Sequence, residues 1–152
     1  MAEDIEQVIE TIEVDEPPSI CFQAIRNLRS TDKNRTLESY NAPEAIIRER
    51  FGCLPVVGET ICTYKEIEKP PNRIEYLMIS SNRFKMFEGS WVLTAESSGG
   101  TKVTLTGSVD PGMRVPLWRQ ISKAATSSRL RKRLHDLQDQ ARKLAKEDVH
   151  NP

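Results

Sequence analysis

Apart from Pro116 near its start, the stretch Val115–Lys146 contains neither proline nor glycine. Its apolar residues recur at intervals typical of an α-helix; they are Trp118, Ile121, Leu130, Leu134, Leu137, Ala141 and Leu144. A helix of this length would extend over roughly 50 Å, enough to cross a small domain. The sequence before it is dominated by strand-like segments, each with an apolar side that must be covered. We therefore expect this helix to lie across one face of a sheet.

Short strand-like segments separated by turn sequences occupy most of the chain before this helix. Alternating residues and turn signals predict strands at residues 5–14, 36–41, 45–51, 56–67, 73–80, 84–95 and 101–109. The segment 45–51 also fits two turns of helix, and we interpret it as a strand. The sequence Asp15-Glu16-Pro17-Pro18 ends the first strand and predicts a short helix over residues 18–29.

The predicted order of elements favours an α+β fold. Consecutive strands joined by short turns give a curved antiparallel sheet, here of six or seven strands, around a long C-terminal helix, with one or two short helices after the first strand. We expect a single domain over residues 1–147 and a flexible tail over residues 148–152. Because a single helix cannot fill the hollow of such a sheet, a cavity is expected between the two.

Composition excludes several classes of function. The chain has 22 Lys plus Arg and 22 Asp plus Glu, so it lacks the basic excess typical of nucleic-acid-binding domains. Its three cysteines are an odd number without CxxC spacing, which indicates neither a disulfide framework nor a metal site, and no cofactor motif is present. No apolar run is long enough to span a bilayer and no signal peptide precedes the domain, so a cytoplasmic location is expected.

The closing half of the sequence resembles a known family. The motifs at residues 88–93, 99–104, 109–112 and 115–118, followed by a long helix, resemble StAR-related lipid-transfer (START) domains and their wider superfamily, which includes polyketide cyclases. The turn sequence at residues 69–74 resembles the stretch that precedes a central strand in the cyclase-like members. This resemblance implies a helix-grip fold that encloses a hydrophobic ligand such as a lipid, quinone or polyketide.

The expected ligand cavity lies between the apolar strand faces and the first half of the long helix. The residues expected to line it are Trp118, Ile121, Tyr64, Tyr76, Met78, Met86, Trp91, Val103 and Leu105. For Trp91 and the two methionines, a role in the core is the alternative. Trp118 lies one turn into the long helix, where the resemblance places residues that cap the cavity.

The apolar residues of the long helix do not stay on one side. At about 100° per residue, Leu117, Trp118 and Ile121 point in one direction, and Leu130 and Leu134 point nearly opposite. This pattern predicts either a kink near residues 126–128 or different packing partners along the helix.

The second half of the helix has a basic side that includes Arg129, Lys132 and Lys143. It is interpreted as a solvated face, with transient contact to an anionic membrane as the alternative.

The sequence leaves three functions open. The first is binding or transport of a hydrophobic small molecule, and the second is a small cyclase or dehydratase that uses the same cavity. The third is a partner-binding module with a collapsed cavity. No catalytic motif is present, and the two histidines, His135 and His150, lie on a polar helix face and at the end of the chain. An acid–base group for the enzyme would have to come from residues such as Tyr64, Tyr76, Arg73, Glu75 and Glu88.

Overall fold

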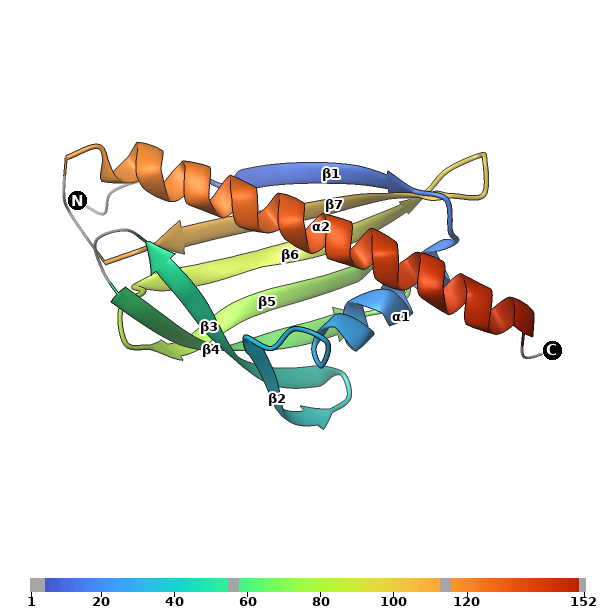
Figure 1. Cartoon of the computed structure of the whole chain (residues 1–152), viewed down its shortest axis with the longest axis horizontal. Helices are drawn as coiled ribbons and strands as arrows, with labels where there is room; N and C mark the ends of the chain where they lie inside the picture. Colours follow the sequence, from blue (N-terminus) through green and yellow to red (C-terminus); the bar gives the residue numbers. More distant parts are fainter. Residues whose placement is uncertain (1–4, 55–57, 113–115, 151–152) are drawn as a thin grey trace.

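The computed structural model describes residues 5–54, 58–112 and 116–150 (Figure 1). Its elements are β1 (Val8–Val14), α1 (Pro18–Leu28), β2 (Arg35–Asn41), β3 (Glu44–Leu54), β4 (Gly58–Lys69), β5 (Arg73–Ser81), β6 (Met86–Ala95), β7 (Thr101–Asp110) and α2 (Trp118–His150). The expected start of a strand at Val56 and of the long helix at Val115 lie outside the described residues. Segment 45–51, for which two readings were open, is part of the strand β3.

The strands form one antiparallel sheet of seven strands in the order β1-β7-β6-β5-β4-β3-β2. Every pair except β1–β7 joins strands that are consecutive in the chain. β1 pairs with β7 and forms one edge of the sheet, and β2 forms the other edge. Register shifts interrupt the β2–β3, β3–β4 and β4–β5 pairs, and such bulges bend and twist the strands in which they occur. Together with the long C-terminal helix, this arrangement confirms the predicted α+β helix-grip architecture.

Helix α1 starts where the proline pair predicts. Pro18 occupies the first turn, where its missing N–H costs no hydrogen bond, and Pro17 precedes the helix in an extended conformation. The helix buries an apolar stripe that consists of Cys21, Phe22, Ala24, Ile25 and Leu28. This stripe packs against α2 and β6. Within the described chain, α1 is the one short helix that follows the first strand.

Helix α2 is one continuous helix that lies across β1 and β7 and then packs on α1 (Figure 1). Its second half buries Leu130, Leu134, Leu137 and Ala141, which join the residues of α1 in the main hydrophobic core. The helix is therefore not broken near residues 126–128, and it has different partners along its length. It also continues to His150, beyond the start of the expected tail; residues 151–152 lie outside the described chain.

The first half of α2 presents a different face to the sheet from the one expected. Ser122 and Thr126 are buried, whereas Ile121 is 45% exposed and Leu117 is 67% exposed. The buried positions 122, 126, 130, 134 and 137 form a single stripe at helical spacing. The expectation that Ile121 faces the sheet is wrong, because the polar residues Ser122 and Thr126 of the first half lie in line with the buried apolar residues of the second half.

Candidate functional site

A cavity of about 410 Å³ lies between β3, β4, β7 and the first half of α2. Its apolar wall includes Phe51, Phe84, Val109 and Ala125. Its polar wall contains Asp32, Asn34, Glu49, Arg50, Thr60, Ser122, Thr126, Ser128, Arg129, Lys132, Arg133 and Asp136. The volume falls within the range of about 300–1,000 Å³ that is usual for small-molecule sites.

A narrow space of about 20 Å³ lies at the inner end of this cavity. Tyr64, Tyr76, Trp91 and Leu105, four of the expected cavity residues, line this inner space together with Phe87. The two spaces share Glu49, Arg129 and Arg133 as walls, so charged side chains form the boundary between them.

The other expected cavity residues lie elsewhere. Trp118 lines a separate hollow of about 240 Å³ between β1, β7 and the start of α2. Val103 is fully buried and Met78 is partly buried against the core. Met86 alternates with the buried Phe87 along β6, so the two side chains lie on opposite sides of that strand. Ile121 is exposed to solvent.

Tyr76 owes its position to a pair of glycines on the neighbouring strands. Gly89 on β6 and Gly107 on β7 are directly paired, and a Cβ atom at either would collide with the Tyr76 side chain. The absence of side chains there lets the ring approach the sheet, and its hydroxyl donates a hydrogen bond to the Thr106 carbonyl oxygen at 2.6 Å. A glycine inside a strand often marks a close approach by another group, and at Gly107 that group is Tyr76.

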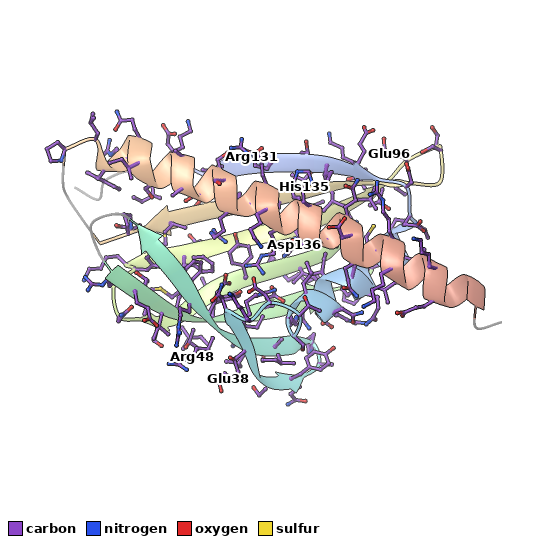
Figure 2. All side chains as sticks on the ribbon, viewed as in Figure 1. Glu38, Arg48, Glu96, Arg131, His135 and Asp136 are labelled. Atoms are coloured by element: carbon purple, nitrogen blue, oxygen red, sulfur yellow. The ribbon has the colours of Figure 1, made fainter. Side chains whose placement is uncertain are left out.

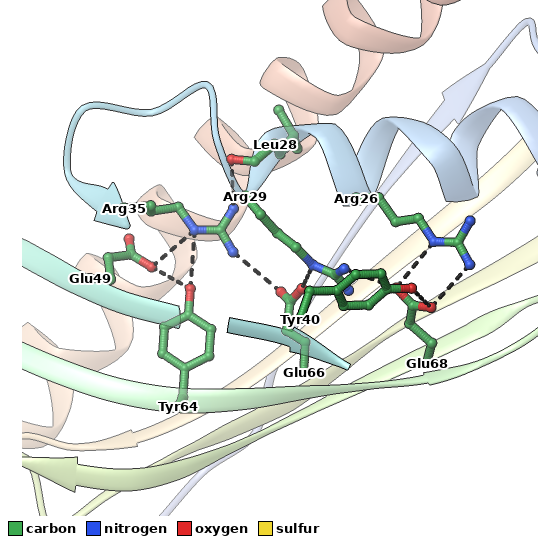
Figure 3. Close-up of polar contacts among 9 residues, drawn as sticks. All are labelled: Arg26, Leu28, Arg29, Arg35, Tyr40, Glu49, Tyr64, Glu66 and Glu68. Atoms are coloured by element: carbon green, nitrogen blue, oxygen red, sulfur yellow. Dashed lines mark hydrogen bonds and ion pairs between the residues drawn. The ribbon is translucent and has the colours of Figure 1, made fainter. Parts of the chain in front are cut away.

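A network of buried ion pairs extends from the inner end of the cavity toward α1 (Figure 3). Arg29 donates to Glu66 at 2.6 Å and to Glu68 at 2.9 Å, and Arg35 donates to Glu66 at 3.2 Å. Tyr40 and Arg26 also donate hydrogen bonds to the Glu68 carboxylate. Burying charges is costly unless they are paired and hydrogen-bonded, and this network pairs every one of these charges; Arg29 Nη2 is the one buried donor of the network without a hydrogen bond among the described residues.

Glu49 connects the network to α2. Its carboxylate accepts hydrogen bonds from the Tyr64 hydroxyl and from Arg133 Nη2, both at 2.7 Å. Arg35 Nε donates in turn to the Tyr64 oxygen at 3.1 Å. Burial raises the pKa of Tyr64 above its ordinary value, so this phenol stays protonated and acts as a hydrogen-bond donor. Glu49 thus holds β3, β4 and α2 together at the cavity wall.

Arg129 belongs to the cavity and not to an exposed basic side of α2. Its guanidinium lies 5.0 Å from the ring centre of Phe87 and 5.5 Å from that of Phe51. Its Nη2 atom is buried and has no hydrogen-bond partner in the described part of the chain. Lys132, the next residue of the expected basic side, is exposed and pairs with Asp136 at 3.1 Å. Arg129 is therefore not part of the free basic side that was expected on α2.

The residues considered for acid–base chemistry do not gather at the cavity. Arg73 and Glu75 pair with each other at 2.8 Å in a part-exposed position, and Lys69 pairs with the same carboxylate. His135 is exposed on α2, where Figure 2 labels it beside Arg131 and Asp136. Of the residues considered, Tyr64 and Tyr76 line the inner space.

The buried ion pairs were missed from the sequence, although one signal was present. Tyr64, Glu66 and Glu68 alternate along β4, and this spacing places them on one face of the strand. That face is the buried one, and Thr60 and Cys62 continue it. A strand whose buried face carries two carboxylates predicts buried cations opposite, and Arg29 and Arg35 supply them.

The pKa of Glu68 predicts how stability depends on pH. Burial by itself raises the pKa of this carboxyl, but hydrogen bonds from Arg26, Tyr40 and Arg29 outweigh it, and the pKa lies below its ordinary value of 4.5. The unfolded chain therefore takes up a proton first as the pH falls, and the stabilisation present above pH 4.5 is lost below it. Urea unfolding between pH 7 and pH 3 measures this. The free energy of unfolding should depend less steeply on pH below pH 4.5 in Glu68→Gln than in the wild type. An unchanged pH dependence in this variant would contradict the prediction.

Comparisons with known proteins identify the fold. The structure is similar to that of TTHA0849 from Thermus thermophilus, with a TM-score of 0.77 and 16% identity over 90% of this chain and 97% of that one. It is also similar to the Zhui aromatase/cyclase from Streptomyces sp. R1128, with a TM-score of 0.77 and 13% identity over 91% and 94% of the two chains. A START superfamily protein from Mycobacterium smegmatis matches with a TM-score of 0.69 and 12% identity over 91% and 98%.

These likenesses confirm the START-like and polyketide-cyclase-like fold that the sequence motifs indicated. No protein-family model matches the chain, and no curated protein matches it in sequence. Identities this low define the fold alone, because one fold supports many activities.

The described residues include no group of three or more His, Cys, Asp or Glu side chains arranged to hold a metal ion. None of the helices they form has the length and apolar character needed to cross a membrane. Cys21 and Cys62 are buried free thiols, and the side chain of Cys53 lies outside the described part of the chain.

Proposed function

We propose that this protein binds a hydrophobic small molecule in the 410 Å³ cavity between β3, β4, β7 and α2. The observation that carries the proposal is the cavity itself, with Phe51, Phe84, Val109 and Ala125 as its apolar wall. An apolar ligand gains free energy by leaving water for such a wall, at about 25 cal/mol per Å² of buried surface. The open volume also argues against the partner-binding alternative, which requires a collapsed cavity.

Binding is favoured over the cyclase or dehydratase alternative by the state of the carboxylates. A general base must direct a carboxylate oxygen at the substrate proton that it removes, whereas both oxygens of a structural carboxylate are directed at protein donors. Glu49, the buried carboxylate at the cavity wall, already accepts hydrogen bonds from Tyr64 and Arg133. Glu66 is held by Arg29 and Arg35 in the same way. An aromatase/cyclase is among the similar structures, so cyclase activity is the second candidate.

Nuclear Overhauser effects from a bound apolar probe test the proposed location. N-phenyl-1-naphthylamine is a neutral aromatic probe with a size suited to a cavity of about 410 Å³. With methyl- and ring-labelled protein, we expect contacts from the probe to Phe51, Phe84, Val109 and Ala125. Contacts confined to exposed apolar residues such as Leu77 and Ile79 on β5, each 52% exposed, would contradict the proposal. Absence of saturable binding would contradict it as well.

A further inference from the structure

The charged residues around the cavity are nearly all joined in ion pairs. Among the described residues, the cations of this cluster with carboxylate partners are Arg26, Arg29, Arg35 and Arg133. The carboxylates that they contact are Glu49, Glu66, Glu68 and Asp32. Arg129 also lines the cavity, but no ion pair to it is found within the described chain. The cluster therefore has one more positive than negative charge, and the surplus lies at Arg129.

The position of Arg129 makes this surplus available to a ligand. The residue lines both the main cavity and its inner end, so its guanidinium stands where the two spaces meet. The rings of Phe51 and Phe87 hold the guanidinium by cation–π contacts. Neither ring supplies a hydrogen-bond acceptor in the plane of the guanidinium, and the buried Nη2 atom makes no hydrogen bond with the described residues. An unpaired buried donor has a free-energy cost that a bound acceptor would remove.

The other cations at the cavity are less suited to this role. Lys132 is exposed and pairs with Asp136, and Arg50 is 62% exposed and pairs with Glu59 at 2.6 Å. Arg133 is buried between Glu49 and Asp32. Each of these groups already has a carboxylate, so a ligand anion would have to compete with it.

The geometry points to a ligand that carries a single negative charge on an oxygen acid group, a carboxylate or a sulfonate, which pairs with Arg129. This inference rests on the proposed function, because it names the class of molecule that the same cavity binds. A guanidinium forms paired hydrogen bonds with the two oxygens of such a group. A monoanion balances the surplus charge, whereas a phosphate dianion would leave a negative charge in excess. The apolar remainder of the ligand then lies toward Phe51, Phe84 and Ala125.

Two fluorescent probes that differ only in the acid group test the inference. These are 1-anilinonaphthalene-8-sulfonate and its neutral counterpart, N-phenyl-1-naphthylamine. The wild-type protein is expected to bind the sulfonate more tightly, by about tenfold or more, because a charge-assisted hydrogen bond is stronger than a neutral one. Arg129→Gln should abolish this preference by weakening sulfonate binding while leaving the neutral probe bound. Arg129→Lys keeps the charge and should retain part of the preference.

Arg131→Gln is the matched control, because it removes a positive charge from the same helix at an exposed position that pairs with Glu10 and does not line the cavity. It should leave the preference unchanged. Equal binding of both probes by the wild type, or an equal loss in Arg131→Gln and Arg129→Gln, would overturn the role of Arg129 while the proposed cavity function stands. Failure of both probes to bind would overturn the cavity function and the inference together. Thermal unfolding of each variant shows that a lost preference does not come from lost structure.

Discussion

Replacing Glu66 with glutamine is expected to lower the free energy of unfolding by about 3–5 kcal/mol. The substitution keeps the shape of the side chain and removes its charge, so two buried guanidinium groups lose their shared partner. Arg29 donates to Glu66 at 2.6 Å and Arg35 at 3.2 Å, and the three side chains are each no more than 4% exposed. Water cannot replace the missing carboxylate at such a site. Urea unfolding of Glu66→Gln and wild type measures the difference.

The matched control is Glu59→Gln, which breaks an ion pair of the same length in a different environment. Arg50 and Glu59 are 2.6 Å apart, but their side chains are 62% and 51% exposed. Solvent screens such a pair, and its loss should change the free energy of unfolding by less than about 1 kcal/mol. Similar losses in the two variants would show that burial does not govern the energetics of the network around Glu66.

The order of the elements and the fold could be predicted from the sequence because both rest on local patterns. Alternating residues identified the strands, the pair Pro17-Pro18 marked the start of α1, and short turns predicted an antiparallel meander. The long stretch free of glycine and proline after Pro116 predicted α2. Each of these signals depends on neighbouring residues alone, so no tertiary contact was needed to interpret it.

The cavity wall could not be predicted as well, because it depends on contacts between distant segments. Tyr64 and Tyr76 were among the residues expected to line the cavity, and both line the inner space. Glu49 and Arg133 are separated by 84 residues and meet only when α2 packs over β3. Charged residues are usually assigned to the surface, so their burial is not apparent before the partners are known.

Helix α2 shows how a hydrophobicity rule fails at a cavity. The rule places apolar residues against the sheet, and it therefore selected Trp118 and Ile121 for the first half of the helix. In the structure, Ser122, Thr126 and Arg129 face inward there. A polar helix face above an apolar hollow is unfavourable for a packed core, but it is compatible with a site that binds a ligand with a polar group.

Substitutions at two adjacent alanines of α2 test the cavity-binding account most directly. Ala125 lines the cavity, whereas Ala124 is exposed and is not part of the cavity wall. Tryptophan at position 125 would project into the cavity of about 410 Å³ and occupy the space of the ligand. We expect Ala125→Trp to weaken binding of N-phenyl-1-naphthylamine by about tenfold or more, which corresponds to a loss of at least about 1.4 kcal/mol of binding free energy.

Ala124→Trp adds the same indole outside the cavity and should leave the affinity unchanged. Fluorescence titration of the probe into the wild type and both variants gives the dissociation constants, and circular dichroism verifies that each variant is folded. A selective loss in Ala125→Trp is the result that this account predicts. Wild-type affinity in folded Ala125→Trp, or an equal loss in both variants, would show that the ligand does not bind between the sheet and α2.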